Sequence, residues 1–206
     1  MTNLFIVYLA AVIVPAFFFS WRVAVLGLGI QGLMLSFVLL AGHEIDSPAV
    51  VIEFLCLLLI RAVFVPWYLL RKCDTRYAQR SFALVGTTLW QRSVVVLLTA
   101  AGFAMGLAMG KGDMRESMQI GTAASSLLIG MLMVANDRQP AAQLVGLFTF
   151  EGGVTLVELL SPHAMSFPIQ MGVTAIDVFF VLTLGQYLAR FPQITPTDGA
   201  AEQEGI

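Results

Sequence analysis

Three ionisable residues lie in the middle of long apolar runs. Arg61 is inside CLLLIRAVFVPWYLL, Glu151 is inside AAQLVGLFTFEGGVTLVELL, and Asp177 is inside PIQMGVTAIDVFFVLTLGQYLA. A lone charge at the centre of a bilayer costs ~2.5–3.5 kcal/mol on insertion scales, so such residues usually pair with one another or mark an ion pathway. Three of them at similar depth in separate runs predict a paired cluster or a buried polar path.

These residues allow two interpretations. In the first, Arg61 forms a static ion pair with Glu151 or Asp177 and only holds helices together. In the second, which we favour, the groups carry or gate a proton. Burial and a neighbouring arginine act on a carboxyl group's pKa in opposite directions, so a group between the two can be tuned to exchange a proton. The sequence leaves open which acid pairs with Arg61.

Two further acids could extend this path. Glu158 lies two helical turns after Glu151 on the same face, and Glu53 lies eight residues before Arg61. Each is near a span end, so contact with interfacial water is the simpler interpretation. Pro66, one turn beyond Arg61, should kink its helix, and Gly152–Gly153 should loosen the helix at Glu151. Broken helices at this depth usually line protein or water rather than lipid.

The composition requires a lipid-facing exterior for these elements. Hydrophobic residues make up 58% of the 206 residues and charged residues only 12%, which is too few polar groups for a water-facing surface. The expected fold is an all-α polytopic transmembrane helix bundle, since ~20 apolar residues cross a bilayer. We predict one transmembrane domain over 1–191 and a disordered cytoplasmic tail over 192–206. Seven spans are expected, near 3–19, 23–42, 50–70, 92–110, 118–136, 141–160 and 168–189.

The basic residues predict the orientation. Two basic residues, Lys111 and Arg115, fall on one side of the predicted membrane, and eight fall on the other. Cytoplasmic loops carry an excess of Lys and Arg, so the side with eight is expected to be cytoplasmic. The N-terminus is therefore expected outside and the C-terminus in the cytoplasm. The first span has no preceding basic residue and no cleavage site, so we expect a retained helix. The other side carries eight basic residues: Arg22, Arg71, Lys72, Arg76, Arg80, Arg92, Arg138 and Arg190.

Shorter features have simpler expectations. The segment 82–91 is too short to cross, so it lies at the interface or extends the fourth span. Trp21, Trp67 and Trp90 are near span ends, as in an aromatic belt. The small residues in Gly27–Gly29 and in the fourth span (Gly102, Gly106, Gly110) are expected to serve helix packing.

Several classes of site are not indicated. A net charge of −2 gives no basic field for nucleic acid. The sequence has no CxxC, HExxH or His/Cys cluster, so no protein-held metal or cofactor is expected. Cys56 and Cys73 lie in an apolar run and a basic loop, which does not suit a disulfide.

The C-terminal third resembles a known family. DRQPAAQLVG, FEGG and GVTAIDVFF with a terminal LAR follow the pattern of the hydrogenase-4 component E family, whose C-terminal half is similar to subunit K of respiratory complex I. The resemblance covers 118–190, and RAVFVPWYLL is similar to the family's third-span segment. Arg61 stands where the family has lysine, and Gly152 where it has asparagine. Arginine keeps its proton, so Arg61 would tune neighbouring acids and not relay a proton itself.

This resemblance implies a non-catalytic membrane-arm subunit in the bacterial inner membrane. Its partners would be antiporter-like and other membrane subunits of a hydrogenase or complex-I-like assembly, with all redox centres in those partners. The proton pathway would use Glu151, Asp177, Arg61, Glu158 and Glu53. The alternatives are an independent small secondary transporter and, less favoured, a membrane enzyme. An internal repeat typical of many transporters is not evident in the sequence.

Overall fold

The described residues of the chain fold into seven helical rods. The computed structural model describes residues 2–18, 20–42, 48–77, 84, 89–136, 140–160 and 167–190, and it confirms the all-α bundle. The rods match the seven predicted spans within a few residues at most ends. They are α1 (Thr2–Phe17), α2 (Trp21–Gly42), a composite of α3 (Pro48–Cys56), η1 (Leu57–Phe64) and α4 (Val65–Tyr77), α5 (Leu89–Met109), α6 (Met114–Asn136), α7 (Pro140–Leu160) and α8 (Phe167–Arg190).

The composite rod contains a long π-helical segment at its centre. The η1 segment carries Arg61, and at its end the Val65 N–H donates to the Ile60 carbonyl, five residues back. The segment ends at Phe64, two residues before Pro66, which has no N–H to donate to a carbonyl of the preceding turn. The irregularity that the sequence predicted around Pro66 therefore lies upstream of it, as a wider helical turn.

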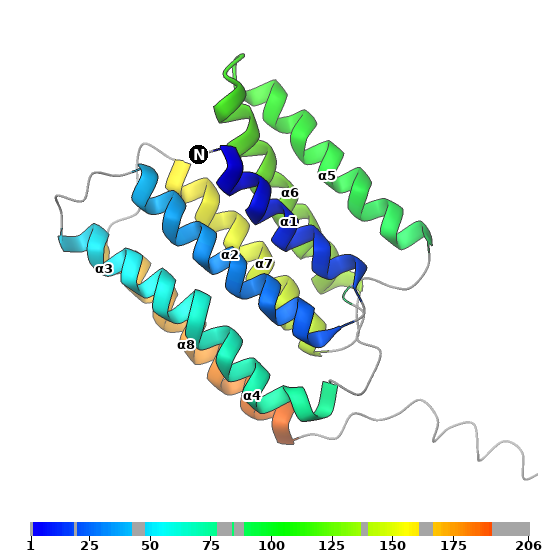
Figure 1. Ribbon diagram of the computed structural model, residues 1–206, viewed down its shortest axis with the longest axis vertical. Helices are drawn as coiled ribbons and strands as arrows, with labels where there is room; N and C mark the ends of the chain where they lie inside the picture. Colours follow the sequence, from blue (N-terminus) through cyan, green and yellow to red (C-terminus); the bar gives the residue numbers. More distant parts are fainter. Residues whose placement is uncertain are drawn as a thin grey trace, which may run out of the picture.

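The rods are arranged in a slab with a central layer and two edges (Figure 1). Helices α1, α2, α6 and α7 pack together in the middle. Helix α5 lies at one edge, mainly against α6, and the composite rod lies at the other edge between α2 and α8. Helix α8 packs mainly against this rod, so it reaches the central layer chiefly through it.

Glycines set the closest helix contacts, as predicted. A side chain at Gly27 would place its Cβ 2.6 Å from Pro15 in α1. On α5, a Cβ at Gly106 would lie 2.6 Å from the Gly121 backbone nitrogen of α6. Gly102 and Gly110 face Ser125 and Ser117 of α6 in the same way. The two backbones can approach this closely only because these positions lack side chains.

Apolar side chains cover much of the outside of the bundle. Leu97 is 66% exposed, and Phe179 is 67% exposed. Five of the described helices are long and apolar enough to cross a membrane, and two shorter apolar helices accompany them, Thr2–Phe17 and Met171–Tyr187. Large exposed apolar surface on transmembrane-length helices is what a bilayer requires. The chain is therefore a multi-pass membrane protein.

The tryptophans only partly follow the expected belt. Trp67 and Trp90 point outward, but Trp21 is buried in the core, so the prediction for Trp21 is wrong. Its ring packs into the core at the start of α2 and does not face the interface. Of segment 82–91, Leu84 is buried and residues 89–91 belong to α5, which supports the helix-extension alternative.

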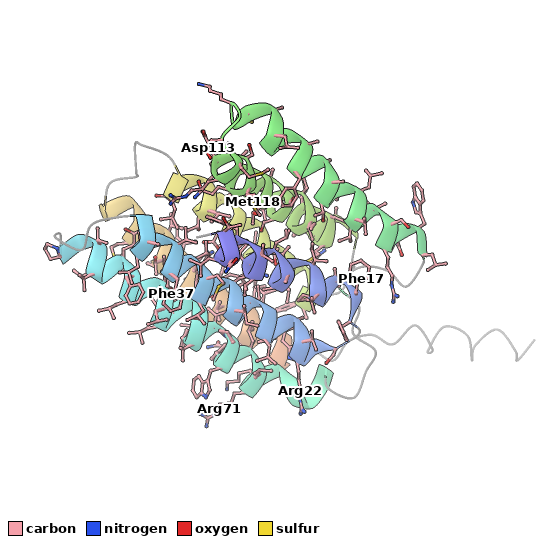
Figure 2. All side chains as sticks on the ribbon, turned by 45° about the horizontal axis from the view of Figure 1, so that its top comes forward. Phe17, Arg22, Phe37, Arg71, Asp113 and Met118 are labelled. Carbon is pink, nitrogen blue, oxygen red and sulfur yellow. The ribbon has the colours of Figure 1, made fainter. Side chains whose placement is uncertain are left out.

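Charged side chains among the described residues lie at both ends of the bundle. Figure 2 shows Arg22 and Arg71 at one end and Asp113 at the other. Arg80, Arg138, His43 and His163 lie outside the described residues, as does the predicted disordered tail over 192–206. The orientation itself stays a prediction from the sequence.

Candidate functional site

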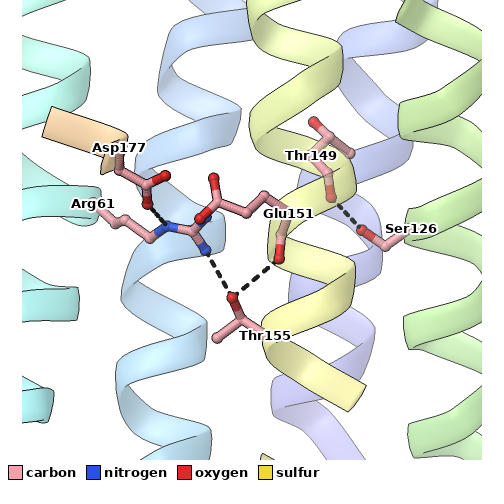
Figure 3. A network of polar contacts seen from close by, with 6 residues as sticks. All are labelled: Arg61, Ser126, Thr149, Glu151, Thr155 and Asp177. Carbon is pink, nitrogen blue, oxygen red and sulfur yellow. Dashed lines mark hydrogen bonds and ion pairs between the residues drawn. The ribbon is translucent and has the colours of Figure 1, made fainter. Parts of the chain in front are cut away.

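The three mid-span charges meet in one cluster. Arg61 forms an ion pair with Glu151 (Nη2 to Oε1, 2.7 Å) and a second with Asp177 (Nε to Oδ2, 3.4 Å). Figure 3 shows the guanidinium of the composite rod between carboxylates from α7 and α8. The sequence left open which acid pairs with Arg61, and the structure gives both.

The π-helical segment turns Arg61 toward the same face of the composite rod as Glu53. Residues eight apart, such as Glu53 and Arg61, point ~80° apart on a regular α-helix. A π-helix turns the chain less per residue, because its hydrogen bonds run from i to i+5. The wider η1 turn therefore brings these two residues toward the same face, and both line the same cavity.

Two residues that sequence reasoning missed fix the arginine in place. Arg61 Nη1 donates to Thr155 Oγ1 (3.3 Å), and Thr155 donates in turn to the Glu151 carbonyl (3.0 Å). A side chain at Gly32 of α2 would lie 2.8 Å from the Arg61 backbone. The signal for Thr155 was its position one turn after Glu151, on the same helical face.

The cluster is largely shielded from the surroundings of the bundle. The side chains of Arg61, Glu151 and Asp177 are 8%, 21% and 11% exposed. Glu151 and Asp177 both contact the single guanidinium of Arg61. The cluster therefore places two groups that can accept a proton beside one fixed positive charge.

A polar cavity of about 40 Å³ contacts the cluster, and we call it the Glu53 cavity. It lies between the composite rod, α7 and α8. All five ionisable residues that the sequence analysis assigned to the proton pathway line it. Glu53 and Glu158 are toward the end of the helices that the sequence places outside. Its walls are Glu53, Cys56, Leu57, Arg61, Glu151, Thr155, Glu158, Val173, Thr174 and Asp177.

A smaller cavity of about 20 Å³ contacts Arg61 from another direction, and we call it the Gln31 cavity. It lies between α2, the composite rod and α7, and it could not be predicted from the sequence. Apolar residues form most of its wall. Its lining is Leu28, Gln31, Gly32, Leu35, Arg61, Val65, Phe148 and Gly152.

Helix α7 carries the cluster without the loosening that was expected at Gly152–Gly153. It is α-helical from Pro140 to Leu160, so that prediction is wrong. The two glycines instead admit neighbours, because a Cβ at Gly152 would lie 2.7 Å from the Tyr8 hydroxyl and one at Gly153 would lie 2.9 Å from Leu127.

Two hydroxyls and a backbone carbonyl join α1, α6 and α7 beside the cluster. The Ser126 hydroxyl donates to the Thr149 carbonyl (2.9 Å) and contacts the Tyr8 hydroxyl (3.2 Å). Because the Ser126 hydrogen is used on Thr149, Tyr8 is the donor in the second bond. The lone pairs of the Tyr8 oxygen can then accept a further hydrogen bond.

The described residues contain no group of three or more His, Cys, Asp or Glu side chains placed to hold a metal ion. Comparison with known proteins yields no further guide, since the chain matches no protein-family model, no curated protein and no solved structure.

Proposed function

We propose that this chain is a non-catalytic membrane subunit that passes protons through the Arg61–Glu151–Asp177 cluster. One observation carries the proposal: five ionisable residues from three helical rods line a single cavity that ends at this buried cluster. A purely structural ion pair needs neither the cavity nor the two additional acids, Glu53 and Glu158.

The charge of the cluster supports proton exchange. One arginine and two ionised carboxylates leave a net charge of −1 in a low-dielectric environment, where uncompensated charge is costly. Taking up one proton makes the cluster neutral. Arg61 keeps its own proton, so the exchange takes place on Glu151 and Asp177, and Thr155 holds the arginine between them.

The size of the cavity favours protons over a larger cargo. One water needs ~10–15 Å³ of such space, so about 40 Å³ has room for a few water molecules. Sites for small organic molecules are typically ~300–1,000 Å³. This difference favours water-mediated proton transfer over the alternative of an independent transporter for a metabolite.

The resemblance to the hydrogenase-4 component E family supplies the wider setting of the proposal. In that setting the chain is a membrane-arm subunit in a bacterial inner membrane, beside antiporter-like subunits of a hydrogenase or complex-I-like assembly. The partners hold the redox centres, and this chain contributes helix contacts and buried carboxylates. The side with Glu53 and Glu158 then faces away from the cytoplasm.

The decisive experiment compares proton flux in vesicles reconstituted with the protein and whatever co-purifies with it. Glu151→Gln keeps the side-chain shape but cannot exchange a proton, so flux should fall while partners are retained. Glu151→Asp should keep part of the flux. Glu116→Gln is the matched control, because Glu116 is exposed at the start of α6, away from the cluster.

Two results would refute the proposal. If Glu151→Gln transports protons as well as the wild type, the cluster is structural. If Glu151→Gln loses its partners or fails to assemble while Glu116→Gln does not, the ion pair is a strut between helices. The identity of the co-purifying proteins separately tests the hydrogenase-type setting against an independent transporter, which would purify alone.

A further inference from the structure

Gln31 presents a buried acceptor to the smaller cavity. Its side chain is fixed by a hydrogen bond from Nε2 to the Ala11 carbonyl of α1 (3.1 Å). In a regular helix that carbonyl would accept from residue 15, but residue 15 is proline and has no N–H. Pro15 thus frees the carbonyl that orients the Gln31 amide, and the amide oxygen must point the other way.

That oxygen has no hydrogen-bond partner among the described residues. Gln31 is only 4% exposed, and its Oε1 atom is buried without a donor. A buried amide oxygen in a native protein is normally satisfied by protein or by ordered water. The Gln31 cavity measures about 20 Å³, above the ~10–15 Å³ that one water requires.

Other polar groups surround the same space. Arg61 lines the cavity with Gln31. The Tyr8 hydroxyl and Gln31 Oε1 lie 2.7 Å and 3.7 Å from the point where a Gly152 side chain would begin. Without a side chain at Gly152, the Tyr8 hydroxyl oxygen and the Gln31 amide oxygen both lie near the same point, next to a cavity that Arg61 also lines. Water can donate to both oxygens, and a buried water typically makes two to four hydrogen bonds.

We propose that the Gln31 cavity binds one water molecule, held by Gln31 Oε1 with Tyr8 and Arg61 as further partners. We also infer that this water forms the second leg of the proton path, on the side of Arg61 away from the Glu53 cavity. The second statement rests on the proposed function, whereas the water site itself does not. Arg61 then stands between two hydrated spaces that contact it from different directions.

Hydroxyl-radical footprinting of the purified protein tests the water site without any transport assay. A buried side chain is oxidised efficiently only when a bound water beside it supplies the radical. Phe148 lines the cavity and is 6% exposed, whereas Phe5 is 1% exposed and lines neither cavity. Phe148 should be labelled several-fold faster than Phe5. Equal labelling in the wild type would overturn the water site.

Two substitutions should remove the water. Gln31→Leu deletes the amide oxygen, and Gly152→Ala places a methyl group 2.7 Å from the Tyr8 hydroxyl oxygen and 3.7 Å from Gln31 Oε1. Each should bring the labelling of Phe148 down toward that of Phe5. Gly172→Ala is the matched control, because a Cβ there meets nothing within 4 Å. If Gln31→Leu does not fold, Gly152→Ala decides, and unchanged Phe148 labelling in a folded variant overturns the site.

Proton flux in the same vesicles tests the second leg. A several-fold loss in Gln31→Leu, with Gly172→Ala unaffected, supports it. If Glu151→Gln abolishes flux but Gln31→Leu does not alter it, the water is off the path and the second leg fails while the proposed function stands. If Glu151→Gln leaves flux unchanged, the proposed function and the second leg both fail, and Phe148 labelling still judges the water site.

Discussion

Removing Arg61 should destabilise the protein by an amount that depends on both of its carboxylate partners. Arg61→Ala deletes two ion pairs and a hydrogen bond and leaves Glu151 and Asp177 facing each other. Breaking a buried pair from one side typically costs ~3–5 kcal/mol, because the remaining charge stays uncompensated. We expect a loss in this range in the free energy of unfolding.

The charges left behind also predict how far a second substitution recovers that loss. In Arg61→Ala the remaining cost is that of two uncompensated carboxylates and the repulsion between them. Neutralising either one, by adding Glu151→Gln or Asp177→Asn, removes its own share and the repulsion, so each double variant should recover about half of the loss or more. The triple variant should recover most of it.

Unfolding of the purified variants by SDS, followed by circular dichroism, measures these differences. Arg71→Ala is the matched control from the same rod: Arg71 is exposed and lies 5.2 Å from the ring centroid of Trp67. A surface cation–π contact of this kind is worth ~0.5–1 kcal/mol. The reasoning is refuted if Arg61→Ala is no less stable than Arg71→Ala, or if the triple variant is no more stable than Arg61→Ala alone.

Three further predictions concern orientation, access and packing. Cys73 should be labelled by an impermeant thiol reagent in inverted vesicles and not in intact cells, and the reverse pattern would invert the orientation. In a Cys73→Ser background, Cys56 on the wall of the Glu53 cavity should react with a small cationic thiol reagent added outside, and complete protection would mean that the cavity is closed to that side. Gly106→Ala should cost ~1–3 kcal/mol in unfolding free energy, because its Cβ would lie 2.6 Å from the backbone of Gly121; Gly172→Ala should cost nothing, and equal stability of the two variants would contradict the close approach of α5 and α6.

The sequence was sufficient for the helices and for the charged members of the site. Seven spans follow from runs of apolar residues, and Arg61, Glu151 and Asp177 stand out because a charge inside such a run is costly. Their meeting could be anticipated from that cost alone. Charge in apolar surroundings is a signal that needs no knowledge of how the helices pack.

The neutral members of the site could not be predicted in this way. Thr155, Gln31 and Tyr8 are ordinary residues in a transmembrane helix. Only the register between helices shows that Thr155 contacts Arg61, that Gln31 lines a cavity with it, and that the Tyr8 hydroxyl lies beside Gly152. The π-helical turn could not be predicted for a similar reason. Pro66 indicated an irregularity in the helix, but the form of that irregularity depends on the packing of neighbouring helices. The prediction for Trp21 was wrong because a position near the end of a span does not reveal which way the side chain points.

The depth of the Glu53 cavity has an electrical consequence. Where water penetrates a membrane protein, the transmembrane voltage drops across the dry remainder, because water screens the field. A hydrated Glu53 cavity would bring the potential of the outer solution down to Glu151 and Asp177. Most of the ~2.3 kcal/mol per charge per 100 mV would then fall across the part of the bundle beyond the two acids, where Leu28, Val65 and Phe148 line the Gln31 cavity with its single proposed water. A proton leaving the cluster toward the cytoplasm would cross that part and with it most of the membrane potential.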